Sequence, residues 1–134
     1  MCLTTNNLKV EDAPKIGYKV FKRHTNKKLY GIIMSTRKSL PTSRWINEVD
    51  YRKSKRINYA GHAYNVYPVG WHIYEYLPTA RKYILNESNE EIHRVKIRNV
   101  CAYGYEDHDR VIVAKEILIK KDWCLKPLGV KIKL

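Results

Sequence analysis

Aromatic rings and cations gather in one stretch of this sequence, Arg44 to Tyr83, which holds two Trp, seven Tyr and the basic run Arg52 to Arg56. Lysine and arginine bind phosphate groups, and exposed rings stack on unpaired bases. The expected phosphate contacts are Arg37, Lys38, Arg44, Arg52, Lys53, Lys55 and Arg56, and the expected stacking rings are Trp45, Tyr51, Tyr59 and Tyr64. The alternative is that the rings belong to the core and the cations to a solvated surface.

The positive charge is concentrated in the first half of the chain. The 134 residues carry a net charge of +13, and residues 15–56 alone contribute +11. An excess of this size on one segment favours a polyanionic partner, which is nucleic acid, an anionic membrane surface or an acidic protein surface. A basic face that only keeps the protein soluble is the competing interpretation.

No motif in the sequence specifies a reaction or a cofactor. The histidines form neither an H-E-x-x-H nor an H-x-H pattern, and no P-loop, G-x-S-x-G or dinucleotide fingerprint is present. His72, between Trp71 and Ile73, is expected to be a packed or hydrogen-bonded core histidine. His108 lies among acidic residues that could hold a divalent ion, although a charged turn is the simpler interpretation. We therefore expect no catalytic residue, no cofactor and no metal.

The cysteines point to a reducing compartment. Cys2, Cys101 and Cys124 are an odd set without C-x-x-C spacing, which argues against a disulfide framework and against a zinc site. The sequence shows no secretory signal pattern and no apolar run long enough to span a membrane. We expect an intracellular protein, in the cytoplasm of a host cell or, in a eukaryotic host, also in the nucleus.

Hydrophobic periodicity predicts a single α+β domain over residues 1–134 that is mainly antiparallel β, either a partly open barrel or a curved sheet. Residues 1–14 are expected to be a loose arm, residues 35–61 a long basic loop, and residues 77–85 one short helix. Strands are expected at 17–23, 29–34, 64–67, 71–74, 91–101 and 111–119, and near the end of 123–134. The apolar run at 111–119 predicts a buried central strand, and the broken phase at Asn99 predicts a bulge.

A set of landmarks resembles small uncharacterised proteins of phages, large DNA viruses and some bacteria. These landmarks are the "YKV" strand at Tyr18 to Val20, the "GWHIY" strand at Gly70 to Tyr74, the helix residue Ala80, and the "V-x-A-x-x-I" strand at Val111 to Ile117. Such proteins are commonly accessory gene products. The resemblance implies a viral accessory protein that interferes with host processes.

The same landmarks look distantly like the ADP-ribosyltransferase fold, in which an early strand contacts the nucleotide and a late strand carries a catalytic glutamate. The resemblance places Lys19 at the early position and offers Glu106 or Glu116 at the late one, and neither glutamate follows the family pattern. Three functions remain open. The leading hypothesis is a non-enzymatic protein that binds nucleic acid or another polyanion. The alternatives are a nucleotide-handling enzyme or its degenerate relative, and an inhibitor that binds an acidic protein surface.

Overall fold

The computed structural model describes residues 3–31, 38–51, 59–62, 65–86 and 88–125 of the chain. Its elements, in order, are η1 (Val10–Asp12), β1 (Ile16–Arg23), β2 (Leu29–Gly31), β3 (Trp45–Asn47), η2 (Glu48–Asp50), β4 (Tyr59–His62), β5 (Asn65–Pro68), β6 (Trp71–Tyr74), α1 (Leu77–Lys82), β7 (Glu90–Glu106) and β8 (Asp109–Leu125). The predicted mainly antiparallel β organisation is confirmed, since every strand pair is antiparallel.

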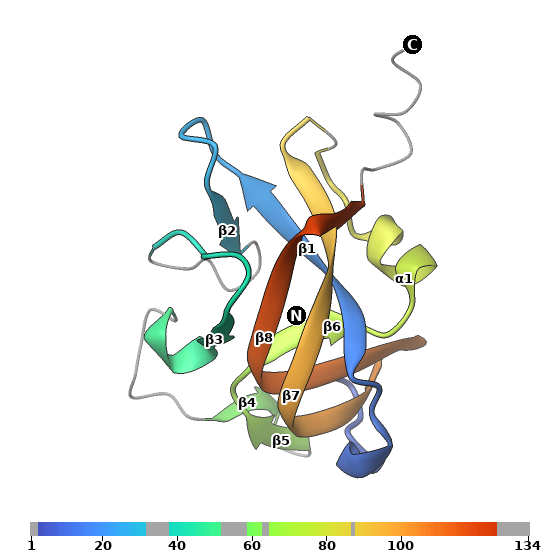
Figure 1. Ribbon diagram of the computed structural model, residues 1–134. Helices are drawn as coiled ribbons and strands as arrows, with labels where there is room; N and C mark the ends of the chain where they lie inside the picture. The colour runs from blue at the N-terminus through green and yellow to red at the C-terminus, as the bar shows by residue number, and fades with distance from the viewer. Residues whose placement is uncertain (1–2, 32–37, 52–58, 63–64, 87, 126–134) are drawn as a thin grey trace.

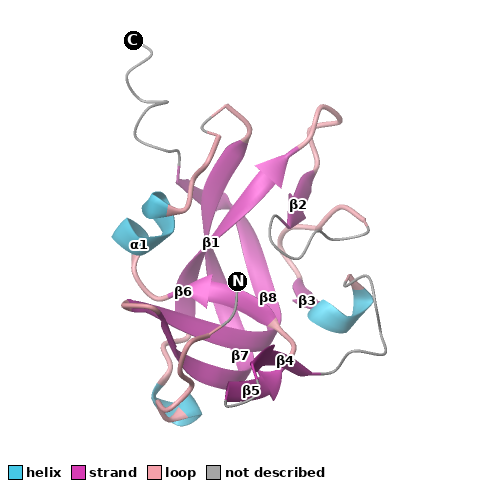
Figure 2. Ribbon diagram, turned by 180° about the vertical axis from the view of Figure 1, so that it is seen from behind, coloured by secondary structure: helices cyan, strands magenta, loops and turns pink. Residues whose placement is uncertain are grey.

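Four strands pair in a closed ring. β7 pairs with β1 along one edge and with β8 along the other, β8 also pairs with β6, and β6 returns to β1 through Tyr18 and Tyr74. The short strands β2 and β3 extend this sheet beyond β1 and β8, while β4 and β5 form a separate two-stranded sheet. In Figure 1, β7 and β8 run side by side and bend together in the lower half of the view. β6 crosses on the other side of this pair and is seen from that side in Figure 2.

The bend in β7 has a local cause. The register between β7 and β8 shifts at Val100 to Ala102, so that one extra β7 residue is accommodated. Asn99, directly before the shift, has a φ of 56°, a left-handed conformation that asparagine tolerates better than most residues. Its side-chain amide donates a hydrogen bond to Glu116 across the strand pair. The bulge that the broken alternation predicted therefore lies at and just after Asn99.

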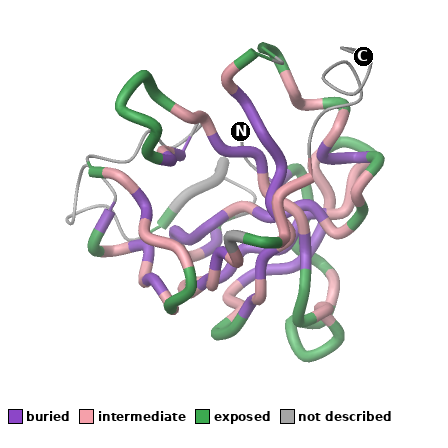
Figure 3. The backbone as a smooth tube through the Cα atoms, turned by 45° about the horizontal axis from the view of Figure 1, so that its top comes forward, coloured by how far each residue is buried: buried purple, intermediate pink, exposed green. Residues whose placement is uncertain are grey.

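Buried side chains fill two clusters. One lies inside the ring and includes Phe21, Ile73, Ile97 and Ile117. The other includes Val20, Ile92 and Val113, with α1 packed over it through Ala80. Figure 3 shows buried backbone in the strands and exposed backbone mainly in the loops and turns.

The first residues are held against the body rather than loose. Leu3 is fully buried, and its backbone N–H donates to the Tyr67 hydroxyl at 2.9 Å. Thr5 forms a β-bridge with Tyr105. Leu8 also contacts the core, whereas Val10 remains 40% exposed.

Several element boundaries differ from the sequence prediction. The described part of the expected 35–61 loop contains β3 and η2, which are too short to show a period, and it ends with β4. The charged turn expected around His108 consists of Asp107 and His108 alone, because β7 continues to Glu106 and β8 begins at Asp109. Residues 35–37, 52–58 and 126–134 lie outside the described part, so a strand near the C-terminus and the whole basic run stay untested predictions.

The central position of β8 can be tested by truncating one side chain. Ile117 is fully buried and lies between β3 and β7, where it pairs with Ile46 and Ile97. We expect Ile117→Ala to lower the free energy of unfolding by about 2–5 kcal/mol, through lost burial and a cavity. Val66→Ala, at a side chain that is 55% exposed, is the control and should change it by less than about 0.5 kcal/mol. Urea denaturation measures the free energy of unfolding of both variants. If both lose equally little, the central placement of β8 is contradicted.

Candidate nucleic-acid interface

One face of the sheet carries rings, cations and apolar side chains next to one another. The register aligns Trp45 of β3 with Leu118 of β8, Leu118 with Lys96 of β7, and Lys96 with Ile16 of β1. Directly paired residues of neighbouring strands project to the same side of a sheet. These four side chains therefore form one row across four strands.

The rows on either side of it continue the pattern. Arg98 and Glu116 pair on one side, and Tyr18 and Arg94 pair on the other. We call the whole set the outer sheet face. Its members are Ile16, Tyr18, Trp45, Arg94, Lys96, Arg98, Glu116, Leu118, Lys120 and Trp123.

Cations lie directly over the rings of this face. The Arg98 guanidinium is 4.2 Å from the centroid of the Trp45 ring. Arg94 lies between two rings, 5.3 Å from that of Trp123 and 5.9 Å from that of Tyr18. The Lys120 amine is 4.6 Å from the Trp123 ring. Within the described residues, these contacts bring together sites that are far apart in the sequence.

Burial separates this face from the core beneath it. Trp45, Lys96 and Leu118 are half-buried and Arg98 is exposed, whereas Val95 and Ile117, which point to the opposite side, are fully buried. The alternation along β7 and β8 therefore assigns one side to the core and the other to solvent. Solvent can reach the rings and cations where they lie.

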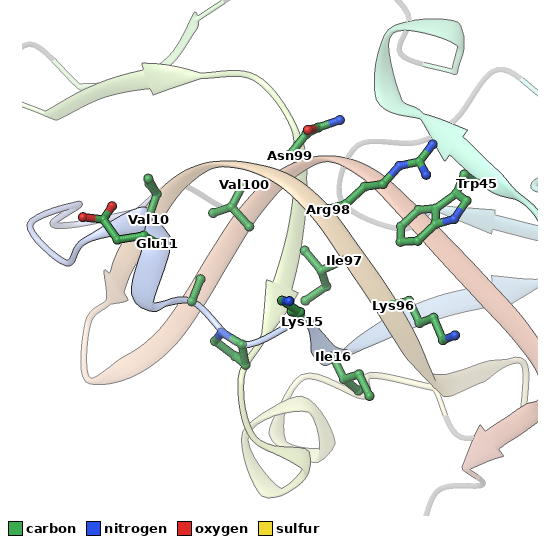
Figure 4. A pocket seen from close by; sticks show the side chains of 12 residues that line it. Val10, Glu11, Lys15, Ile16, Trp45, Lys96, Ile97, Arg98, Asn99 and Val100 are labelled. Atoms are coloured by element: carbon green, nitrogen blue, oxygen red, sulfur yellow. The ribbon is translucent and has the colours of Figure 1, made fainter.

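A groove of about 710 Å³ opens at one end of the outer sheet face. In Figure 4, Arg98 extends toward Trp45, while Lys96 and Lys15 come from β7 and from the segment leading into β1. Its walls are η1, the start of β1, β3 and the β7 bulge. The lining residues are Val10, Glu11, Ala13, Pro14, Lys15, Ile16, Trp45, Lys96, Ile97, Arg98, Asn99 and Val100. The groove thus offers a ring and an apolar wall beside three cations.

Glu116 holds Arg98 in place over Trp45. Its carboxylate accepts a hydrogen bond from Arg98 at 2.9 Å and another from Asn99. The hydrogen bond from Arg98 lowers the pKa of Glu116 below its usual value, because it stabilises the ionised form. Glu116 therefore already fixes the guanidinium in one orientation. Because of this, little further conformational entropy is lost when a planar or anionic partner binds to it.

Of the residues predicted from the sequence, the structure places Lys38, Arg44, Trp45, Tyr51 and Tyr59. Trp45 lies on the outer sheet face, with the exposed Arg44 next to it in sequence. Tyr51 is buried against Trp71, and Lys38 lies 4.8 Å from its ring centroid. Tyr59 is 65% exposed on β4, in the separate sheet. Arg37, Arg52, Lys53, Lys55, Arg56 and Tyr64 lie outside the described residues.

The cations of β7 were not among the predicted contacts, although the sequence carries a signal for them. In "EIHRVKIRNV", Arg94, Lys96 and Arg98 alternate with apolar residues, so that three successive positions on one face of the strand are cationic. Tyr18 and Trp123 join them only through the pairing of β1 and β8 with β7. Such neighbours depend on strand register, which composition does not reveal.

His72 is hydrogen-bonded, as the sequence analysis expected for a core histidine. Its Nε2 lies 3.2 Å from the Tyr67 hydroxyl, and burial lowers the pKa of His72 to about 4. Lys19 donates a hydrogen bond to the His72 carbonyl at 2.9 Å, and burial lowers the pKa of Lys19 to about 8. Both groups face protein partners rather than the outer sheet face.

The two late glutamates occupy different surroundings. Glu116 is ion-paired with Arg98 on the outer sheet face, whereas Glu106 lies at the far end of β7, where burial raises its pKa. His108 is exposed in the turn between β7 and β8. The neighbouring Asp109 accepts hydrogen bonds from Lys82 and Tyr83.

No family model, curated protein or solved structure matches this chain. Among the described residues, no helix has the length and apolar character needed to cross a membrane.

The exposure of the outer sheet face can be tested with the three tryptophans of the chain. Trp45 and Trp123 are half-buried, whereas Trp71 is 5% exposed. We expect acrylamide to quench a smaller share of the fluorescence in Trp45→Phe and Trp123→Phe, because each change removes an accessible emitter. Trp71→Phe should leave a larger quenchable share. Stern–Volmer plots measure the three variants. A larger quenchable share in Trp45→Phe and Trp123→Phe than in Trp71→Phe would contradict the assignment of the two faces.

Proposed function

We propose that this protein binds single-stranded nucleic acid on its outer sheet face, and that it acts by binding rather than by catalysing a reaction. The observation that supports the proposal best is the set of ring–cation contacts on the outer sheet face. The cations can neutralise phosphates, and the rings beside them can stack on bases.

Interleaving of the two residue types favours nucleic acid over a general polyanion. An acidic protein surface or a sulfated polysaccharide needs the cations and makes little use of Trp45 and Trp123. Bases have apolar planes on both sides, and stacking on an aromatic side chain contributes about 1–3 kcal/mol per base. Arg98 and Arg94 already lie against aromatic rings on this face. The face therefore offers a stacking surface for a base and a positive charge for a phosphate.

The form of the surface favours single strands. The outer sheet face is part of a twisted sheet, and in the described residues its contacts come from side chains on strands rather than from a projecting helix. Rings on such a sheet reach bases that are unstacked and splayed, which a duplex does not present. The groove beside Trp45 could take a base at the end of the row.

The electrostatic part of the proposal predicts a specific salt dependence. We expect the variant with Arg94, Lys96, Arg98 and Lys120 each changed to Gln to bind a labelled oligothymidine more weakly. Each lost phosphate contact should reduce the slope of log K against log salt by about 0.7. Fluorescence anisotropy across a salt series measures both quantities.

Lys28→Gln serves as the charge control, since Lys28 is exposed on the turn between β1 and β2. This change should leave the slope nearly unaltered. A slope that stays the same in the fourfold variant would remove the outer sheet face from the interface.

Stacking can be separated from charge by changing the rings. Trp45→Leu and Trp123→Leu should each weaken oligothymidine binding by about 1–3 kcal/mol while the salt slope stays constant, because no cation is lost. Tyr59→Leu removes an exposed ring from the separate β4–β5 sheet and should have little effect. If the tryptophan variants bind normally and heparin competes fully, the surface instead recognises anionic charge alone.

A further inference from the structure

Three side chains with metal-binding atoms meet on the inner side of the β7–β8 pair, away from the outer sheet face. Glu91 and His93 are two residues apart on β7, so they project to the same side, and Cys124 of β8 is the direct partner of His93. One carboxylate oxygen, one imidazole nitrogen and the thiol sulfur all lie within 4.8 Å of one another. We propose that Glu91, His93 and Cys124 bind one zinc ion.

The donor types and spacing suit zinc. Zinc is bound by thiolate, imidazole and carboxylate at about 2.0–2.3 Å, which places tetrahedral donor atoms roughly 3.3–3.8 Å apart. The Glu91 oxygen and His93 Nε2 are 2.9 Å apart, so an ion between the donors requires side-chain shifts of less than about 1 Å. A thiolate donor selects zinc over magnesium or calcium, which prefer oxygen ligands.

The orientation of His93 also supports a cation at this place. Its Nδ1 faces the Lys120 carbonyl at 3.5 Å, and its Nε2 faces the Glu91 carboxylate. Both ring nitrogens therefore face acceptors, whereas a neutral imidazole has only one N–H to donate. A metal ion at Nε2 would leave the single N–H on Nδ1, where it faces the Lys120 carbonyl. A backbone carbonyl that orients the other nitrogen is a common feature of metal-binding histidines.

The basic surroundings do not oppose the ion. Arg23 donates to the same Glu91 oxygen through its Nε and Nη2 atoms. The Glu91 carboxylate and a Cys124 thiolate supply two negative charges, which match the two positive charges of the zinc ion. Arg23 can therefore keep its carboxylate partner beside a neutral centre.

A pocket reaches His93, one of the three proposed ligands, and offers a place for a fourth ligand. It has a volume of about 350 Å³ and is lined by His93 and Arg23, by the hydroxyl residues Ser39 and Thr42, and by Lys27 and Lys28 among others. Three protein ligands with one open position are typical of zinc sites that bind water or a substrate group. The cationic lining would favour an anionic fourth ligand.

Cobalt substitution tests the site directly. The full-length protein is treated with EDTA and titrated with Co²⁺, which gives a thiolate-to-cobalt charge-transfer band when a cysteine binds it. We expect one equivalent to saturate the band and Zn²⁺ to displace it. Cys124→Ser should lose the band, whereas Cys101→Ser should keep it, because Cys101 lies elsewhere and its thiol contacts the Val113 and Pro68 carbonyls.

A measurement on the unaltered protein covers the case in which Cys124→Ser does not fold. Alkylation of each cysteine is followed by peptide mass spectrometry with and without Zn²⁺. Zinc should slow the modification of Cys124 and leave that of Cys101 unchanged, since a metal-bound thiolate is shielded from the reagent. The proposal is overturned by an absent band, by a band that survives in Cys124→Ser, or by alkylation of Cys124 that zinc does not slow.

Discussion

The pairing of β7 with β8 is the constraint on which the rest of the structure depends. The two strands, each of 17 residues, are paired from Glu106 and Asp109 at the turn to Ile92 and Leu125 at the far end. β1 and β6 join them to close the ring, and β3 attaches to β8. The hairpin's apolar side chains supply much of the core, and the alternate side chains of both strands form the middle of the outer sheet face.

The main strands and the helix could be predicted because their sequences are periodic. β1, β6, β7 and β8 alternate or run apolar as buried strands do, and Pro78 begins a helix that buries Ala80. β3 and β4 escaped prediction because three or four residues carry no recognisable period. Their existence depends on partners, since β3 is held by β8 and β4 by β5.

The candidate site was harder to predict than the fold. Composition directed attention to the basic run near Arg52, whereas the described ring–cation contacts centre on β7. Trp45 was proposed from the sequence as a stacking ring, yet the cation over its ring, Arg98, lies more than fifty positions away. The same limitation hid the meeting of His93 with Cys124, because sequence spacing shows metal sites only when their ligands are close along the chain. In both places, strand register determines which side chains become neighbours.

A short segment of β8 serves both proposed sites. Between the pairs His93–Cys124 and Val95–Ile119, β8 contributes more residues than β7, so the strand bulges there. Lys120 in this bulge turns its side chain to Trp123 on the outer sheet face, while its carbonyl faces His93 on the inner side. A displacement of this segment would change both surroundings together, which gives binding on one side a physical route to the other.

Closure of the ring also limits the strand edges at which molecules of this protein could aggregate. Long strands with unpaired edges are templates for joining strands of other molecules, and β7 and β8 would be hazardous in an open sheet. Here the two longest strands have neighbours on both sides, and the six-stranded sheet ends at β2 and β3, of three residues each. Leu40 bridges to Leu29 on the free side of β2. Among the described residues, the six-stranded sheet of a molecule so rich in tyrosine and β-branched residues thus ends in brief edge strands.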